Sequence, residues 1–351
     1  MRSPAVALGC ALSLFAHGAM ATPSRWSLAQ SPQAFEEEVA VRTAEKAFIE
    51  SATVRLRRQQ DPLADPLAPI PGALQALKKV DADRSNNWYA RHLFARATQA
   101  LGRWPEAVVV WERSLLDPET PPPFRADALA ELAIAYARVN RQADEIAAYD
   151  AAIALEEGGA SAHMLPRDFP GGGRVSMLAN QAEGFLVMGD VERAIAGYRA
   201  SLESVDSTLM GFLYSPTALW SLGVALDRSG DLAAALDSIA LARSYDPNDS
   251  RIKGPGWFFV PSYEEHYYWA LGHLLVARSA ADQDDRIAAY ERSVDSWATY
   301  LASAPDTDHY VPVARARLKL ANKEFGDLKK RAATPTPIDP RQPAQPAPKK
   351  P

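Results

Sequence analysis

The chain has 351 residues with 38 basic and 43 acidic side chains, which gives a net charge of −5. This balance, without a basic patch, argues against nucleic acid as the main partner. The single cysteine, Cys10, lies in an N-terminal segment that we expect to be removed. The mature chain would then have no disulfide, no thiolate nucleophile and no Cys-ligated metal.

The first 21 residues have the pattern of a signal peptide. Arg2 supplies a positive charge, Val6 to Phe15 form an apolar run, and Ala19-Met20-Ala21 gives a small-residue cleavage pattern. The run is much shorter than the roughly 20 apolar residues of a membrane-spanning helix. We therefore predict cleavage after Ala21 and a periplasmic or secreted protein without a transmembrane segment after cleavage. An uncleaved N-terminal anchor is the alternative.

Residues 22–86 are predicted to form an N-terminal helical cap with a Pro-rich loop. Ser31-Pro32 is a typical helix start, because Ser caps the helix and Pro fits its first position. Apolar residues then follow helical spacing to Gln60. A Pro-rich stretch from Asp61 to Pro71 separates this helix from a short one predicted over Gly72 to Val80.

The clearest internal repeat lies between Leu219 and Pro247. Its pattern is Leu219-x2-Leu222-Gly223-x2-Leu226, then Gly230, then Ala235-x3-Ile239-x2-Ala242 and Pro247. Gly223 and Ala235 are small where two antiparallel helices would cross, and Gly230 would turn the chain between them. The pattern resembles the tetratricopeptide repeat, which is W-x2-L-G-x2-Y…A-x3-F…P over about 34 residues. A helical repeat of another family is the alternative.

The same spacing recurs in five units over residues 87–300. The equivalent small residues are Ala95, Ala133, Ala182, Gly223 and Gly272, and the large residues expected in the core of the second helices are Trp111, Tyr149, Tyr198 and Tyr290. In the fifth unit we expect an insertion from Ala281 to Asp285 to displace the second helix. The resemblance implies an all-α fold, a right-handed superhelical solenoid of antiparallel helical hairpins.

The C-terminal part of the chain is predicted to form a capping helix followed by a tail without a fixed structure. A capping helix is expected within residues 301–328, because its apolar residues have helical spacing. Residues 329–351 are rich in Pro, Ala and Lys and contain no aromatic residue. Such a segment buries too little apolar surface to offset its ordering entropy, so we predict a disordered tail.

A solenoid of this kind presents a concave groove, which is lined by the first helix of each hairpin. Helical phase places ten residues on that face as candidate partner-binding residues: Tyr89, His92, Arg96, Glu183, Trp220, Asp227, Arg228, His266, Trp269 and His273. Tyr, Trp and Arg often carry the binding energy of interfaces. The competing interpretation places Trp220 and Trp269 in the packing between hairpins and treats the histidines as ordinary, partly buried residues.

Two loops depart from the repeat, and one of them carries aromatic residues. The first runs from His163 to Gly173, and the second runs from Gly254 to Pro261. Trp257, Phe258 and Phe259 follow one another in the second loop. Either they fold back as a plug on the adjacent hairpin, or they form an exposed apolar patch for a partner.

Motifs for catalysis or metal binding are weak in this chain. His266 and His273 are seven residues apart, which is roughly 10 Å along a helix and too far to share one ion. The glycines 171–173 lack the Lys-Ser/Thr of a phosphate-binding loop, and no G-x-S-x-G motif occurs. We expect no catalytic residues, no bound metal and no cofactor.

The resemblance to tetratricopeptide repeats implies a role in protein–protein contacts. We therefore expect a non-enzymatic scaffold that binds a peptide or protein partner through its concave groove in the cell envelope. Two alternatives stay open at this point. The stacked hairpins could form a structural subunit of an envelope assembly, or the aromatic groove could bind glycan or cell wall.

Overall fold

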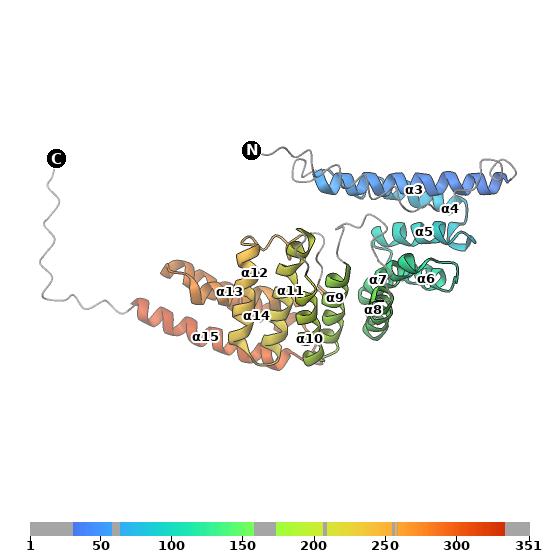
Figure 1. Cartoon of the computed structure of the whole chain (residues 1–351). Helices are drawn as coiled ribbons and strands as arrows, with labels where there is room; N and C mark the ends of the chain where they lie inside the picture. The colour runs from blue at the N-terminus through green and yellow to red at the C-terminus, as the bar shows by residue number, and fades with distance from the viewer. Residues whose placement is uncertain are drawn as a thin grey trace, which may run out of the picture. The chain divides into compact units, whose positions relative to one another are not determined.

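A computed structural model of the chain describes residues 31–57, 64–157, 173–205, 209–254, 257 and 259–333. These residues form thirteen α-helices, one short 3-10 helix and no strand, which confirms the predicted all-α class (Figure 1). The predicted signal peptide, most of the predicted tail, residues 163–172 of the first loop, and Phe258 lie outside the described residues. The chain divides into two units, residues 1–260 and 261–351.

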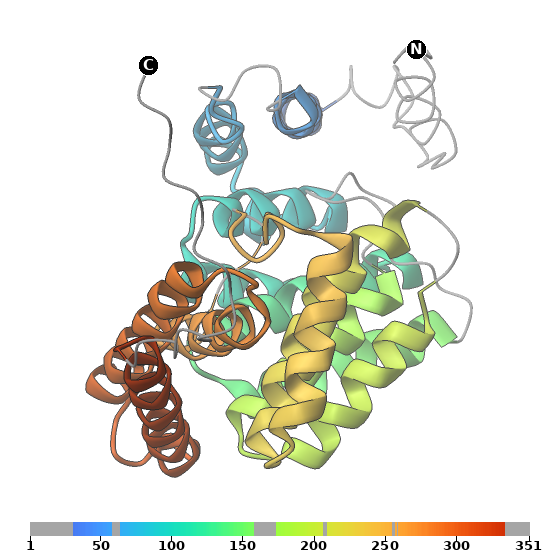
Figure 2. The ribbon, with the colours of Figure 1, turned by 90° about the vertical axis from the view of Figure 1, so that its left-hand side faces the viewer.

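The first unit consists of helices that pack mainly against their neighbours in the sequence. They are α3 (Pro32–Arg57), α4 (Ile70–Lys79), η1 (Ala82–Arg84), α5 (Trp88–Ala100), α6 (Trp104–Leu115), α7 (Pro122–Arg138), α8 (Gln142–Glu157), α9 (Gly173–Val187), α10 (Val191–Glu203), α11 (Leu209–Arg228) and α12 (Leu232–Tyr245). From α5 onward they form four antiparallel hairpins, and Figure 2 shows α10 to α12 side by side.

Each of these four hairpins turns through one residue in the left-handed backbone region. The turn residues are Gly102, Asn140, Gly189 and Gly230, with φ between +60° and +101°. Glycine adopts this conformation without strain, and asparagine tolerates it better than most other residues. The turn at Gly230 is therefore confirmed, and the same local chemistry closes the other three hairpins.

Small residues mark the places where paired helices cross, as the repeat pattern predicts. A Cβ atom at Gly223 would lie 2.7 Å from Ile239 Cγ1 and 3.0 Å from the carbonyl oxygen of Ala235. Ala95, Ala133 and Ala182 are fully buried at the equivalent positions of the other hairpins. The aromatic residues predicted in the core, Trp111, Tyr149, Tyr198 and Tyr290, are all buried.

The N-terminal helix α3 packs on α4 and α5. It begins at Pro32, and the backbone N–H of Ala34 donates to Ser31 Oγ at 3.2 Å, which confirms the predicted cap. Its inner face buries small apolar residues: Ala40, Val41, Ala44 and Ala47. The following helix, α4, begins at Ile70, two residues earlier than the predicted short helix, because Pro71 fits the first turn.

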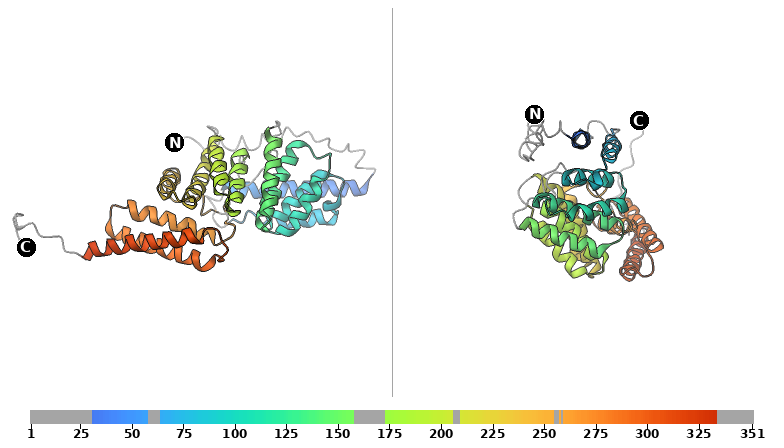
Figure 3. Two further views of the ribbon diagram at one scale, coloured as in Figure 1. Left: turned by 90° about the horizontal axis from the view of Figure 1, so that it is seen from below. Right: turned by 90° about the vertical axis from the view of Figure 1, so that its right-hand side faces the viewer.

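The second unit is formed by three helices, α13 (Glu264–Ser279), α14 (Gln283–Ser303) and α15 (Val311–Ala333), which run side by side in Figure 3. Residues 281–285, which were expected to form an insertion in this hairpin, include the start of α14. Asp282 caps α14 by accepting from the backbone N–H groups of Asp284 and Asp285 at 2.8 and 3.0 Å. Residues 281–285 are thus the helix start itself.

Polar contacts connect the helices of the second unit. Tyr263 and Tyr300 both donate their hydroxyl groups to the carboxylate of Asp308, at 2.8 and 3.0 Å. Arg278 of α13 and Tyr290 of α14 both donate to Glu324 of α15. The last helix is therefore connected to both helices of the hairpin, as expected for a cap.

Helix α15 extends further than the predicted cap, so residues 329–333 are helical and the expected start of the tail at Lys329 is wrong. The ammonium group of Lys329 lies over the Phe325 ring, 3.8 Å from its centre. Lys330 and Arg331 occupy the last turn, where positive charges interact favourably with the negative end of the helix dipole. The fifth hairpin belongs to the second unit, although the sequence pattern joins it to the other four. None of the helices described is long and apolar enough to cross a membrane.

Candidate partner-binding face

Five of the ten residues expected in the groove are buried in the fold instead. At most 7% of the surface is exposed in each of them: Tyr89, His92, Trp220, Asp227 and Arg228. Helical phase placed them away from the crossing inside their own hairpin. Helical phase within one hairpin does not show whether neighbouring helices and loops also cover the side of the helix that faces away from the crossing.

Tyr89 and His92 of α5 illustrate this covering. The hydroxyl of Tyr89 donates to Glu45 of α3 at 3.0 Å, and burial next to that carboxylate raises the pKa of Tyr89. His92 lies between the Trp111 and Phe124 rings and faces Asp127 of α7. Both side chains hold helices together and are not available to a partner.

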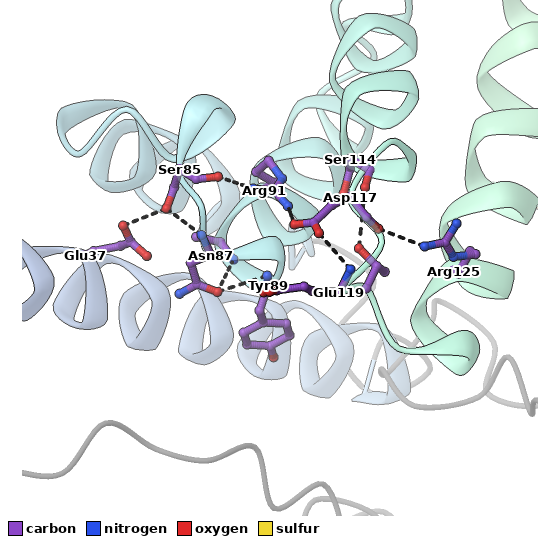
Figure 4. Close-up of polar contacts among 11 residues, drawn as sticks. Glu37, Ser85, Asn87, Tyr89, Arg91, Ser114, Asp117, Glu119 and Arg125 are labelled. Carbon is purple, nitrogen blue, oxygen red and sulfur yellow. Dashed lines mark hydrogen bonds and ion pairs between the residues drawn. The ribbon is translucent and has the colours of Figure 1, made fainter.

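The start of α5 is fixed by a polar network that involves four segments of the first unit (Figure 4). Asn87 caps α5 by accepting from the backbone N–H groups of Tyr89 and Ala90. Arg91 donates to the carbonyl of Ser85 and to the Asp117 carboxylate. Arg125 of α7 donates to the carbonyl of Asp117 at 2.8 Å. These hydrogen bonds all join segments of the fold to one another, so we assign this network to the fold.

Trp220 of α11 has a structural role of the same kind. Only 1% of its surface is exposed, and the guanidinium of Arg243 lies over its ring at 5.2 Å. Arg243 in turn donates twice to Asp249, at 2.9 and 3.0 Å. The competing interpretation of Trp220 as a core residue is therefore correct.

Arg96 and Glu183 are half-buried, and each contacts a neighbouring helix. The Arg96 guanidinium lies 4.9 Å from the centre of the Phe48 ring on α3. Glu183 accepts a hydrogen bond from the Tyr198 hydroxyl. Burial of Glu145 on α8, together with the charge of Glu183, raises the pKa of Glu145 to about 8.

The remaining three candidates lie on one face of α13. His266, Trp269 and His273 are spaced by three and four residues, and all three are half-buried. The indole N–H of Trp269 donates to Glu265 one turn earlier, at 3.0 Å, which orients the ring. We call these three residues the α13 face. The indole ring of Trp269 lies between the two imidazoles, and its side chain is less buried than that of Trp220.

The aromatic loop contributes two described side chains. Trp257 and Phe259 are both half-buried, and their rings meet edge to face at 6.0 Å between centres. The backbone N–H of Trp257 donates to the carbonyl of Gly254 at 3.1 Å. The two rings therefore pack partly on each other.

The sequence pattern missed one cavity in the first unit, which has a volume of about 490 Å³. It is lined by residues of four elements and the turn between two of them: Lys78, Asp81, Asp83, Phe94, Glu106, Val109, Val110 and Arg113. The only signal in the sequence was a set of charged residues at the ends of short helices, which solvated surfaces also show. Within the described ranges, no group of three or more His, Cys, Asp or Glu residues gathers as a metal site.

No family model and no curated protein matches the chain. Solved structures that are similar to it include MamA, at 17% identity over 56% of this chain and 95% of that one, with a TM-score of 0.41. BtubC from P. vanneervenii is 15% identical over 91% and 99%, with a TM-score of 0.36. The Cut9-Hcn1 hetero-tetramer of the APC/C is 15% identical over 89% and 57%, with a TM-score of 0.44.

The chain's own helices define its class. Antiparallel hairpins follow one another with small residues at their crossings and left-handed turns between their helices. The fold is thus a tetratricopeptide-like helical repeat.

Proposed function

We propose that this chain is a protein–protein interaction scaffold that holds a peptide or protein partner, with the α13 face as its contact surface. The proposal depends on Trp269, a large aromatic side chain that is half-buried and oriented by Glu265. Rigid aromatic residues give a large contact area at little cost in conformational entropy, and they often dominate binding energy.

The neighbours of Trp269 support the same role. His266 and His273 lie one turn before and one turn after it, so they place polar imidazole rings on either side of the indole. An aromatic centre with polar groups around it is the usual composition of a small interface. Such a face suits a short peptide or one helix of a partner better than a small molecule.

A pull-down with a matched control tests the proposal. The full chain, Trp269→Ala and Leu116→Ala would each be immobilised and exposed to an extract of the source cells. Leu116 follows the last residue of α6 and is 81% exposed, so its truncation removes an apolar side chain far from α13 in the sequence. We expect one partner to be retained by wild type and Leu116→Ala and lost from folded Trp269→Ala. Equal recovery with all three chains would contradict the assignment.

We also propose that the scaffold is exported to the cell envelope. The support is the sequence of residues 1–21, with its positive charge, apolar run and Ala-Met-Ala cleavage pattern. Cell fractionation followed by N-terminal sequencing tests this proposal. A mature protein that begins at Thr22 in the periplasm or medium is expected, and a cytosolic chain that retains Arg2 would refute it.

A further inference from the structure

The cavity of the first unit has an apolar floor. Phe94 of α5 and Val110 of α6 are buried at its base, whereas Val109, also on α6, is 52% exposed. A half-exposed valine on a helix gains stability when an aliphatic group covers it. A volume of about 490 Å³ lies within the range of small-ligand pockets and exceeds that of one side chain.

The rim of the cavity is charged, and most of its charges are already paired. Arg113 lies 3.0 Å from the carboxylate of Asp83, and Lys78 lies 3.8 Å from that of Glu106. Glu106 also pairs with Arg103, one turn away. Both basic side chains that line the cavity are therefore matched by acids on the same rim.

Asp81 is the exception on this rim. It is exposed in the turn between α4 and η1, and its carboxylate makes no ion pair with any residue that the structure describes. Its backbone lies in the left-handed region, with φ of +50°. An unpaired carboxylate beside an apolar floor is complementary to a side chain with a long aliphatic stem and a cationic head.

We infer that the cavity between α4, η1 and α6 is a binding site for a basic side chain, Lys or Arg, of a partner polypeptide. The stem covers Val109 and the floor, and the head pairs with Asp81. This site is in the first unit, so it goes beyond the α13 face and does not depend on it. It gives the scaffold a second contact with its own charge preference.

The inference is tested by combining charge-removing substitutions in the protein with charge-changing substitutions in a peptide ligand. The probes are fluorescein-labelled Ser-Gly-Leu-Arg-Leu-Gly-Ser and the same peptide with citrulline or Glu in place of Arg. Fluorescence polarisation would measure their binding to the full chain, to Asp81→Asn and to Asp237→Asn. Asparagine tolerates the left-handed backbone, so Asp81→Asn keeps the turn. Asp237 is an exposed aspartate on α12 and serves as the matched control.

We expect Asp81→Asn to weaken binding of the Arg peptide about threefold, because the ion pair to this exposed carboxylate is screened by water, and to leave binding of the citrulline peptide unchanged. Asp237→Asn should bind both peptides as wild type does, and Val109→Ala should weaken the Arg peptide about threefold. Three results would each overturn the inference: no saturable binding of the Arg peptide, equal binding by both Asp variants, or equal binding of the Glu peptide.

Discussion

His92 of α5 and Asp127 of α7 face each other in the core of the first unit, with Nε2 3.3 Å from Oδ2. At most 2% of either side chain is exposed, and the Trp111 and Phe124 rings meet the imidazole edge to face. The pair joins the first helices of two successive hairpins. Its polar groups are expensive to bury unless each satisfies the other.

Removal of the carboxylate should therefore destabilise the first unit. We expect Asp127→Ala to lower the free energy of unfolding by about 1–3 kcal/mol, because it removes a polar group that faces the buried imidazole. Asp127→Asn keeps an oxygen acceptor and should cost less. Urea denaturation followed by circular dichroism measures both variants. An unchanged midpoint for Asp127→Ala would show that the pair does not hold α5 and α7 together.

The raised pKa of Glu145 should make the stability of the fold depend on pH. Burial raises its pKa from 4.5 to about 8, and the charge of Glu183 adds to the effect. The folded chain then keeps a proton that the unfolded chain releases near pH 4.5. This contribution to stability is fully present below pH 4.5 and is lost as the pH rises to about 8.

The variant Glu145→Gln keeps the neutral form at every pH. We expect its Tm to exceed that of wild type at pH 8 and the difference to shrink toward pH 5. Thermal unfolding in a series of buffers measures this, and Glu192→Gln, an exposed change on α10, is the control. A constant difference between Glu145→Gln and wild type across the range would refute the shifted pKa.

Gly223 tests the close approach of helices α11 and α12. Gly223→Ala would bring a methyl group within 2.7 Å of Ile239 Cγ1 and 3.0 Å of a backbone oxygen, so we expect a loss of about 1–3 kcal/mol. Gly326→Ala on α15 meets nothing within 4 Å, and the helix should gain about 0.5–1 kcal/mol. Chemical denaturation compares the two variants. The same effect from both would mean that the crossing is not tight.

The repeat architecture was predictable because it depends on local chemistry. Turn residues such as Gly102 and Gly230 and small crossing residues such as Gly223 act within one hairpin, so their spacing in the sequence carries the information. The cap at Asp282 was misread as part of an insertion, although an Asp at a helix start is a recognised signal.

The candidate site was predictable only in part, because exposure depends on contacts between hairpins. Helical phase placed Trp220 and Trp269 in equivalent positions on their helices. Arg243, which donates to Asp249 in the following loop, covers Trp220, whereas Trp269 is only half-buried. The cavity at Asp81 could not be predicted from the sequence, because its walls combine the first repeat hairpin with α4 and η1, which lie outside the repeat pattern.

Site-specific photocrosslinking at position 269 tests most directly whether the α13 face holds a partner. A benzophenone amino acid would replace Trp269 in one chain and Leu116 in another, and both would be irradiated in the source cells. We expect a discrete adduct with one second polypeptide at position 269 and none at position 116. Adducts of the same kind at both positions, or none at position 269, would contradict it.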